Sequence, residues 1–411
     1  MIIGINASFL RKIDSGIGQV TVNFLRQLIK EERSKEKRER NKFIFYLEED
    51  FDQQLIGLRA DEEEFFRKEI FLPIYRRDDL IRKIWWEKWL LPRKAKRDGC
   101  TVFFSLYQSA TVFNKNKNIK HLMLVHDVIW KIFPQYLNNL RKKIYYFLVE
   151  KAIIKANKIL TVSHSSKQDL KKFLDLEKEK VTVATIDCDK SFKLSTTKKQ
   201  GTTEILATYK IDKSGYIFYV GGFDVRKNVG LLIEAYGCLW KKYQENDWQK
   251  KWTFPDLVLA GKFNADLVPV VENLPQKIDE ITKKYALPKE KIKMVGFVKQ
   301  EDLPIFYYQA SLFVFPSLYE GFGLSPLEAF NCGCPALVNN NSSLKEITEK
   351  NSLISMVMND PEKLAEKMQK VLVNDYLQKK MIAIEKKQTV KFSWKNFNSK
   401  VAKELNELKT V

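Results

Sequence analysis

The sequence predicts an α/β protein with two doubly wound domains, each built on a mostly parallel sheet. Short apolar runs rich in β-branched residues alternate with amphipathic helical segments, and this alternation occurs twice along the chain. A polar segment (189–215), rich in Lys and Thr and without a strong hydrophobic period, separates the two series and is expected to be a linker. The 411 residues also exceed one ordinary core, so two domains of roughly 200 residues each are expected.

In the first half, an apolar strand in MIIGINAS (1–8) leads to a loop with Gly16 and Gly18. A helix follows, and its apolar face is formed by Val20, Phe24, Leu25 and Leu28. The mixed-sign segment 30–42 is expected to be the end of this helix and an exposed loop. Further strands are expected at 41–49, 100–106, 120–128 and 180–186, and a helix, a strand and a second helix at 141–174.

The alternation restarts after the linker. Strands are expected at 216–222, 256–262, 292–298, 312–317 and 334–339. Helices are expected at 228–240, 278–286 and 301–310, from Ser325 onward, and at 392–409, where Phe392 and Trp394 anchor an amphipathic helix. The predicted domains are therefore 1–190 and 191–392, with a helix at 393–411 that packs back toward the first domain. We expect a cleft between the domains at the carboxyl ends of their strands, where open α/β sheets bind ligands.

The composition limits the compartment and the chemistry. No signal peptide and no apolar run of spanning length is found, and the five cysteines are scattered, so a cytoplasmic, soluble protein is expected. Cys332 and Cys334 have no second ligand pair nearby, so a zinc site is not expected. The D-x-D segment 187–189 resembles a metal-binding motif of another fold, and we assign it to a loop without metal.

The net charge of +20 suggests an anionic partner. The candidates are nucleic acid, an anionic membrane and a phosphorylated small molecule. No nucleic-acid-binding module is found, so nucleic acid is disfavoured. Segment 76–97 carries nine Lys or Arg, three acidic residues and three Trp. Two interpretations stay open: a basic amphipathic helix lying on an anionic bilayer, or a helix whose core face consists of Ile81, Ile84, Trp85, Trp89 and Leu90.

The stretch YEGFGLSPLEAF (319–330) contains two carboxylates, Glu320 and Glu328. Ser325 at an N-cap with Glu328 three residues later predicts a capping box, which by itself explains Glu328. A helix N-terminus lowers the pKa of a nearby carboxyl, so we expect both glutamates to stay ionised and to accept hydrogen bonds from hydroxyls.

The loop just before this helix follows a buried strand and contains Gly321 and Gly323 on either side of Phe322. It brings free backbone N–H groups and a helix N-terminus to the carboxyl edge of the sheet. This arrangement suits an anion or a sugar–phosphate ligand.

These motifs resemble those of the retaining glycosyltransferases of family 4, which have the GT-B fold of two Rossmann-like domains facing a cleft. The resemblance covers about residues 1 to 400 and is closest to the mannosyltransferase branch. It rests on the segments SGIGQVTVNFLRQL, WEKWLLPRKAKRDG, VHDVIWKIFPQYL, TVSHSSKQDL, YVGGFDVRKNVGLLIEAY, YEGFGLSPLEAFNCGCPALVNNNSSLKEI and FSWKNF.

The resemblance implies transfer of a hexose, mannose or glucose, from a nucleotide-diphosphate sugar such as GDP-mannose or a UDP-hexose, with retention and without metal. The implied acceptor is a glycan or a polyprenyl-linked glycan at the inner face of the membrane. Arg226 and Lys227 would neutralise the diphosphate, and His126 and Glu320 would lie beside the transferred sugar. The implied donor-binding residues are Gly16, Gly18, Gly321, Phe322, Gly323, Leu324 and Glu328. At Gly222 much of the family has an Arg, which gives Arg226 more of that role or leaves the site weaker.

Two other functions compete with this one. A glycoside hydrolase or phosphorylase would use Glu320 and Glu328 as its paired carboxylates. A non-catalytic polyanion-binding protein would account for the basic charge alone.

Overall fold

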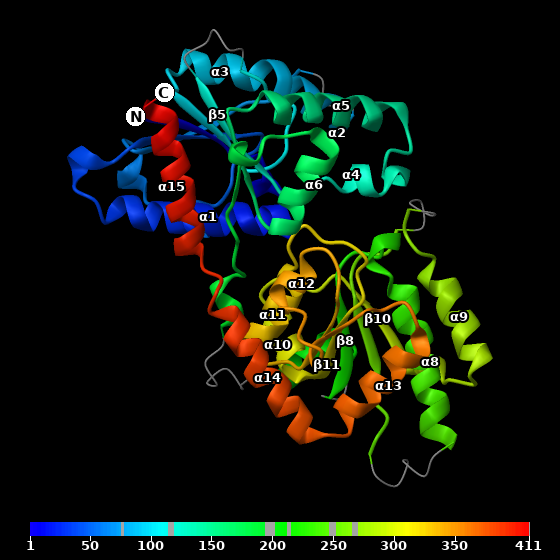
Figure 1. Cartoon of the computed structure of the whole chain (residues 1–411). Helices are drawn as coiled ribbons and strands as arrows, with labels where there is room; N and C mark the ends of the chain where they lie inside the picture. The colour runs from blue at the N-terminus through cyan, green and yellow to red at the C-terminus, as the bar shows by residue number, and fades with distance from the viewer. Residues whose placement is uncertain are drawn as a thin grey trace. The chain divides into compact units, whose positions relative to one another are not determined.

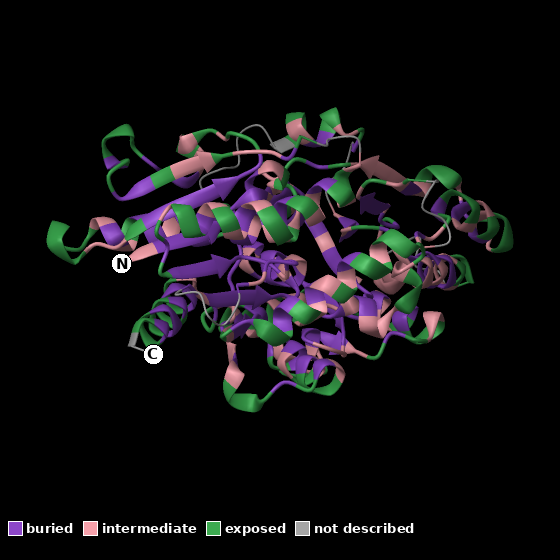
Figure 2. Cartoon of the chain, turned by 90° about the horizontal axis from the view of Figure 1, so that it is seen from above, coloured by how far each residue is buried: buried purple, intermediate pink, exposed green. Residues whose placement is uncertain are grey.

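The computed structural model describes residues 1–74, 78–113, 119–193, 202–211, 215–245, 252–264 and 270–410. The chain forms two units (Figure 1). The first consists of Met1–Asp187 and Phe392–Val411, and the second of Cys188–Lys391. Most strand residues are buried in both units (Figure 2). Among the described residues, no helix is long and apolar enough to cross a membrane.

The first unit is built on a seven-stranded parallel sheet with the order β3-β2-β1-β4-β5-β6-β7. Its strands are β1 (Ile2–Asn6), β2 (Lys42–Leu47), β3 (Phe66–Ile70), β4 (Val102–Ser105), β5 (Lys120–Val125), β6 (Lys158–Thr161) and β7 (Val181–Val183). The strand order reverses between β1 and β4, so the loops after these two strands diverge at the carboxyl edge, where such sheets bind ligands.

Helices cover both faces of this sheet. On one face lie α1 (Gly16–Arg33) and α15 (Trp394–Thr410), joined through the ring of Phe24, whose centroid is 5.5 Å from that of Phe104 and 5.9 Å from that of Phe397. On the other face, Trp86 and Leu91 pack in one cluster with Phe103. This face is covered by α2 (Asp79–Trp85), the π-helical turn η5 (Trp86–Leu90), α3 (Leu91–Arg97) and α5 (Leu140–Lys155). The remaining helices of the unit are α4 (Ile129–Ile132) and α6 (His164–Leu174).

The second unit has a six-stranded parallel sheet with the order β10-β9-β8-β11-β12-β13. Its strands are β8 (Tyr216–Val220), β9 (Leu257–Ala260), β10 (Ile292–Gly296), β11 (Ala310–Phe315), β12 (Ala336–Asn339) and β13 (Ser355–Met356). Its helices are α7 (Thr202–Thr208), α8 (Val229–Glu245), α9 (Leu274–Lys284), α10 (Leu303–Gln309), α11 (Leu324–Cys332), α12 (Leu344–Ile347), α13 (Pro361–Leu372) and α14 (Asp375–Thr389). The order reverses between β8 and β11, which makes this the switch point of the sheet.

The prediction of two parallel α/β sheets is confirmed, and three details differ. The segment expected to be a linker contains the helix α7, while 194–201 and 212–214 lie outside the described residues. Strands β3 and β13 and helices α13 and α14 were not predicted. Of the core face considered for segment 76–97, only Ile84 and Leu90 pack against the core, whereas Ile81, Trp85 and Trp89 are 37%, 40% and 42% exposed. Trp86 and Leu91 are buried in their place. The π-helical turn shifts the helical register, so the buried stripe falls on other residues.

Candidate active site

Two turns follow the strands at the switch point of the second unit. The basic turn (residues 221–228) follows β8 and contains Arg226 and Lys227. The glycine-rich turn (residues 316–323) follows β11 and contains Glu320. Because β8 and β11 are paired neighbours in a parallel sheet, both turns leave the same edge side by side.

The side chains of the two turns meet at one carboxylate oxygen. Lys227 Nζ lies 2.7 Å and Arg226 Nη1 3.0 Å from Oε1 of Glu320. The hydroxyl of Ser317 donates to the same oxygen at 2.6 Å. The ion-paired side chains are only 12–17% exposed, so water screens these contacts weakly. The two turns therefore adjoin each other at the carboxyl edge of this sheet.

The charges in this cluster shift the pKa values of Glu320 and Lys227. Burial raises the pKa of Glu320, but Arg226 and Lys227 together outweigh burial and lower that pKa to about 2. Burial also lowers the pKa of Lys227, which Glu320 opposes. Glu320 is thus ionised at neutral pH, as predicted. Within the described part of the chain, its second oxygen, Oε2, has no hydrogen-bond partner.

Backbone contacts fasten the glycine-rich turn to the basic turn. Arg226 Nη1 donates to the carbonyl of Tyr319 at 2.9 Å, and the Leu318 N–H donates to the carbonyl of Arg226 at 2.6 Å. A second ion pair joins Arg226 Nε to Asp224 Oδ1 at 3.0 Å. The Arg226 guanidinium therefore links the two turns and also contributes a positive charge to the Glu320 cluster.

A polar segment after β12 holds the other side of the glycine-rich turn. Ser342 Oγ accepts from the Glu320 N–H at 3.0 Å. Ser343 Oγ lies 2.8 Å from the carbonyl oxygen of Glu320 and 2.6 Å from that of Phe322. The Asn339 amide donates to the carbonyl of Ser317 at 3.1 Å. Sequence reasoning did not assign these residues to the site, although the run NNNSS (339–343) directly after an apolar strand was an available signal.

The glycine-rich turn ends at Gly323, where α11 begins. Gly323 has φ +120°, and a Cβ built there would lie 2.7 Å from Leu344 Cδ2 and 2.8 Å from Ile347 Cδ1. It is the N-cap residue, so no side chain caps the helix and Ser325 lies inside it. The predicted capping box is wrong, because Gly323 takes the N-cap position and Ser325 lies in the first turn of the helix.

Glu328 lies on α11 but does not join the Glu320 cluster through any bond of the described residues. Its Oε2 accepts from the hydroxyl of Tyr307 at 2.9 Å. Burial raises its pKa to about 7, Tyr307 opposes this rise, and Asp189 adds to it. The expectation that this pKa is lowered is wrong, because Glu328 is only 8% exposed and its burial raises the pKa.

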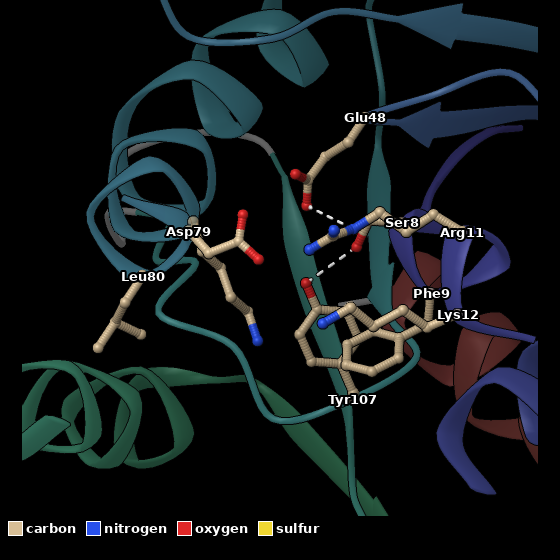
Figure 3. Close-up of a pocket in the computed structure, with 9 residues that line it drawn as sticks. Ser8, Phe9, Arg11, Lys12, Glu48, Asp79, Leu80 and Tyr107 are labelled. Atoms are coloured by element: carbon tan, nitrogen blue, oxygen red, sulfur yellow. Dashed lines mark hydrogen bonds and ion pairs between the residues drawn. The ribbon is translucent and has the colours of Figure 1, made fainter. Parts of the chain in front are cut away.

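The first unit has a small pocket at its own switch point, with a volume of about 190 Å³ (Figure 3). Arg11 and Lys12 come from the loop after β1, Glu48 follows β2 and Tyr107 follows β4. The Arg11 Nε lies 3.6 Å from Glu48 Oε1. Cations, two carboxylates and two aromatic rings thus converge on one concave surface, a set that suits a polyhydroxylated or phosphorylated ligand.

Gly16 and Gly18, the predicted glycine loop, begin α1 beside this pocket. Ser15 is the N-cap, and its side chain accepts from the Gly18 N–H. A Cβ on Gly18 would lie 2.0 Å from the carbonyl oxygen of Lys12. The close approach that Gly18 permits is therefore to its own loop, which positions Lys12 at the pocket.

His126 follows β5 at the carboxyl edge of the first sheet. Its Nε2 lies 3.0 Å from the carbonyl oxygen of Leu106, next to the pocket residue Tyr107. Burial lowers the pKa of His126 to about 4, and the bond to Leu106 only partly offsets this, so the imidazole is neutral at pH 7. The Asp127 carboxylate accepts from the Ile129 N–H at 3.1 Å.

Residues 202–388 match the family model Glycosyl transferases group 1. The chain is 25% identical over 291 residues to O-antigen chain mannosyltransferase B of Escherichia coli, covering 71% of each protein. It is 26% identical over 278 residues to the serotype-specific mannosyltransferase WbdA of E. coli, but this match spans only 32% of that longer protein. A third similar protein is the O-antigen chain mannosyltransferase RfbU of Salmonella typhimurium, 23% identical over 56% of this chain and 54% of RfbU.

Solved structures agree over nearly the whole chain. WaaG, a glycosyltransferase involved in lipopolysaccharide biosynthesis, superposes with a TM-score of 0.68 at 16% identity, covering 98% of both chains. HepE of Anabaena, in complex with UDP, superposes with a TM-score of 0.66 at 13% identity, covering 99% of both. The chain is therefore a glycosyltransferase of the GT-B fold whose residues 202–388 match the glycosyl transferases group 1 family model.

Proposed function

We propose that the protein is a retaining, metal-independent hexosyltransferase that transfers mannose or glucose from a nucleotide-diphosphate sugar to a hydroxyl of a glycan. Mannose is favoured because several similar proteins are named mannosyltransferases. GDP-mannose and UDP-hexoses are the candidate donors.

The observation that carries this proposal is the convergence of Arg226 and Lys227 on Glu320 at the switch point of the second sheet. Departure of a nucleoside diphosphate concentrates negative charge on the β-phosphate, and fixed cations stabilise that charge. An ammonium group carries three N–H donors, so Lys227 keeps donors for a phosphate beyond its bond to Glu320. The cations are preorganised by the carboxylate and need little rearrangement on binding.

Glu320 and Glu328 would act as hydrogen-bond acceptors for the donor. Oε2 of Glu320 is open to a hydroxyl of the transferred hexose, while its Oε1 stays bound to the cations. Glu328 would accept from the ribose, and the amides of the turn Gly321, Phe322, Gly323 and Leu324 would hold sugar hydroxyls.

The proton of the acceptor hydroxyl would pass to the leaving phosphate on the same face of the sugar, so no protein base is required. The neutral imidazole of His126 would hydrogen-bond to the sugar. Under this proposal the reaction needs no metal.

We further propose that the acceptor binds in the first unit and is a glycan, free or carried on a polyprenyl lipid. The pocket lined by Arg11, Lys12 and Tyr107 is the candidate subsite. The enzyme would then work in the cytoplasm, associated peripherally with the inner face of the cell membrane.

The test is an incubation of the full chain with GDP-mannose or UDP-hexoses and a mannose-terminated oligosaccharide. We expect release of a nucleoside diphosphate from one donor, an α-linked product by proton NMR, and an unchanged rate in EDTA. A β-linked product contradicts retention, and loss of activity in EDTA contradicts metal independence. Sugar release that requires phosphate or no nucleotide would favour the hydrolase or phosphorylase alternative.

A further inference from the structure

A groove of about 460 Å³ opens on the first unit, away from the carboxyl-edge loops of β1 and β2 that line the pocket of Figure 3. One wall is formed by η5 and α3, the other by the second half of α5, and the segment after β4 completes it. Trp89, Val112 and Leu148 contribute apolar surface to the lining. The groove therefore has enough volume to hold part of a hydrocarbon chain and an apolar portion of its lining to contact one.

Five cations line the groove: Lys88, Arg93, Lys96, Lys151 and Lys155. No carboxylate lies among the described lining residues, and none of the five cations forms an ion pair within the described ranges. The neighbouring Lys94 shows the contrast, since its Nζ lies 2.8 Å from Glu69 and 2.9 Å from Asp98. No described carboxylate therefore neutralises the positive charges of the groove, and an anionic ligand would neutralise them.

Exposed apolar side chains continue from the groove along both helices. On α2 and η5, Trp85 and Trp89 are one helical turn apart, and both are exposed. On α5, Ile144 and Phe147 are 48% and 54% exposed and precede the groove residues Leu148 and Lys151 on one stripe. Lys151 Nζ lies 4.2 Å from the Phe147 ring centroid. Aromatic and aliphatic side chains interleaved with lysines are typical of surfaces that enter the interface of an anionic bilayer.

We propose that this groove binds an anionic phospholipid, with the phosphate among the five cations and an acyl chain along Trp89, Val112 and Leu148, and so holds the first unit on a negatively charged membrane. A soluble phosphate would satisfy the cations but leave the apolar lining and the exposed stripes unused. A nucleic acid would meet the charges, but nothing would cover the aliphatic side chains of Ile144 and Leu148. The lipid alone accounts for both sets of residues.

The first test is flotation of the full chain with vesicles of phosphatidylcholine alone and of phosphatidylcholine with phosphatidylglycerol. The groove triple Lys96→Gln, Lys151→Gln, Lys155→Gln is compared with a surface triple Lys30→Gln, Lys171→Gln, Lys178→Gln, which removes the same charge from exposed positions of the same unit. We expect binding only to anionic vesicles, reduced on the order of a hundredfold by the groove triple. The surface triple should change it by less than threefold.

The second test probes acyl-chain contact through Trp fluorescence. Phosphatidylglycerol with brominated acyl chains should quench the wild-type emission, and the Trp89→Phe variant should lose a clear part of that quenching. Unbrominated vesicles are the control. Circular dichroism checks that each variant is folded.

Equal flotation on neutral and anionic vesicles, or equal loss in the two triples, would overturn the proposal. So would displacement from vesicles by sodium phosphate but not by sodium chloride at the same ionic strength, which would mark a free-phosphate site. Binding of an RNA oligonucleotide that the groove triple abolishes, without vesicle flotation, would assign the groove to nucleic acid. The turns proposed to bind the donor diphosphate lie in the other unit. Failure here therefore leaves the transfer assay unaffected, and failure of that assay leaves this one unaffected.

Discussion

Glu320 binds two cations and a hydroxyl through one oxygen, an arrangement that holds the carboxylate ionised while leaving its other oxygen to a ligand. The resemblance to the family 4 glycosyltransferases identified Arg226 and Lys227, and the glycine-containing loop after a buried strand singled out Glu320. Sequence reasoning did not identify Ser343 or Tyr307, which come from segments brought near only by the folded chain.

Replacing Glu320 with Gln should lower the free energy of unfolding by about 3 kcal/mol at pH 7, because two largely buried cations lose their counter-charge. The pKa of Glu320 is lowered to about 2 in the fold, so its stabilising contribution is complete above the unfolded pKa of about 4.5. That contribution disappears as the pH falls toward 2. Urea denaturation at pH 7 and pH 3 should therefore show a smaller difference between variant and wild type at pH 3. The exposed Glu290→Gln serves as control, and an identical difference at both pH values would contradict the assignment.

Glu328 should make nucleotide binding depend on pH near neutrality. Burial raises its pKa to about 7, whereas a carboxylate that accepts from a ribose hydroxyl must be ionised. Affinity for the nucleoside diphosphate should thus fall up to about tenfold per pH unit below 7 and level off above it. Calorimetric titration from pH 5.5 to 8.5 measures this. The Glu328→Gln variant should bind weakly with a flat profile, and a wild-type slope retained in that variant would refute the role.

Raising the pH should also affect the stability of the free protein through Glu328. The pKa of Glu328 in the folded protein lies above its value in the unfolded chain. The contribution of Glu328 to stability is therefore complete below pH 4.5 and is lost as the pH rises through 7. The wild type should lose about 3 kcal/mol relative to Glu328→Gln between pH 4.5 and pH 8.5. Urea denaturation of both proteins at the two pH values tests this, and parallel profiles would contradict it.

At the scale of elements, the entry into α11 depends on Gly323. The Gly323→Ala substitution adds a methyl group within 2.8 Å of Leu344 and Ile347 at a φ of +120°. We expect a loss of about 2–4 kcal/mol of stability and a displaced glycine-rich turn, so nucleotide binding should weaken at least tenfold.

Gly333→Ala is the matched control, because Gly333 ends the same helix at φ +70° with its nearest neighbour, Ile382, at 4.0 Å. The Gly333→Ala substitution should lower the free energy of unfolding by only about 1–2 kcal/mol, from backbone strain alone, and should leave the nucleotide affinity unchanged. Equal losses of affinity in the two variants would show that α11 as a whole, and not its N-terminal packing, determines binding.

The elements that sequence reasoning missed share a physical reason. The strand β3 reads FRKEI, with charged residues at an edge position and no apolar run. The strand β13 has two residues, too few for a period. The segment 76–97 was predicted as one regular helix, but the π-helical turn inside it moved Trp85 and Trp89 outward, and periodicity alone does not reveal such a turn.

At the scale of the whole molecule, the chain leaves the first unit after Asp187 and returns to it at Phe392. The returning helix α15 buries Phe397 against Phe24 of α1. The Phe397→Ala variant should therefore lose about 3–5 kcal/mol, with increased hydrogen exchange in α1 and α15. The exposed Val390→Ala should change stability by less than about 0.5 kcal/mol. Faster exchange confined to the second unit would contradict the packing described for α15.

The central claim is that the basic and glycine-rich turns bind the diphosphate of the donor. The most direct measurement is calorimetric titration of GDP, UDP, ADP and dTDP, and of the matching nucleosides, into the wild type and the Lys227→Gln variant. We predict that one diphosphate binds the wild type and stabilises it by about 2.7 kcal/mol at a hundred times its Kd. The variant should bind that diphosphate at least tenfold more weakly, while its affinity for the nucleoside stays unchanged. Equal affinity of both proteins for the diphosphate, or no binding of any of the four, would contradict the claim.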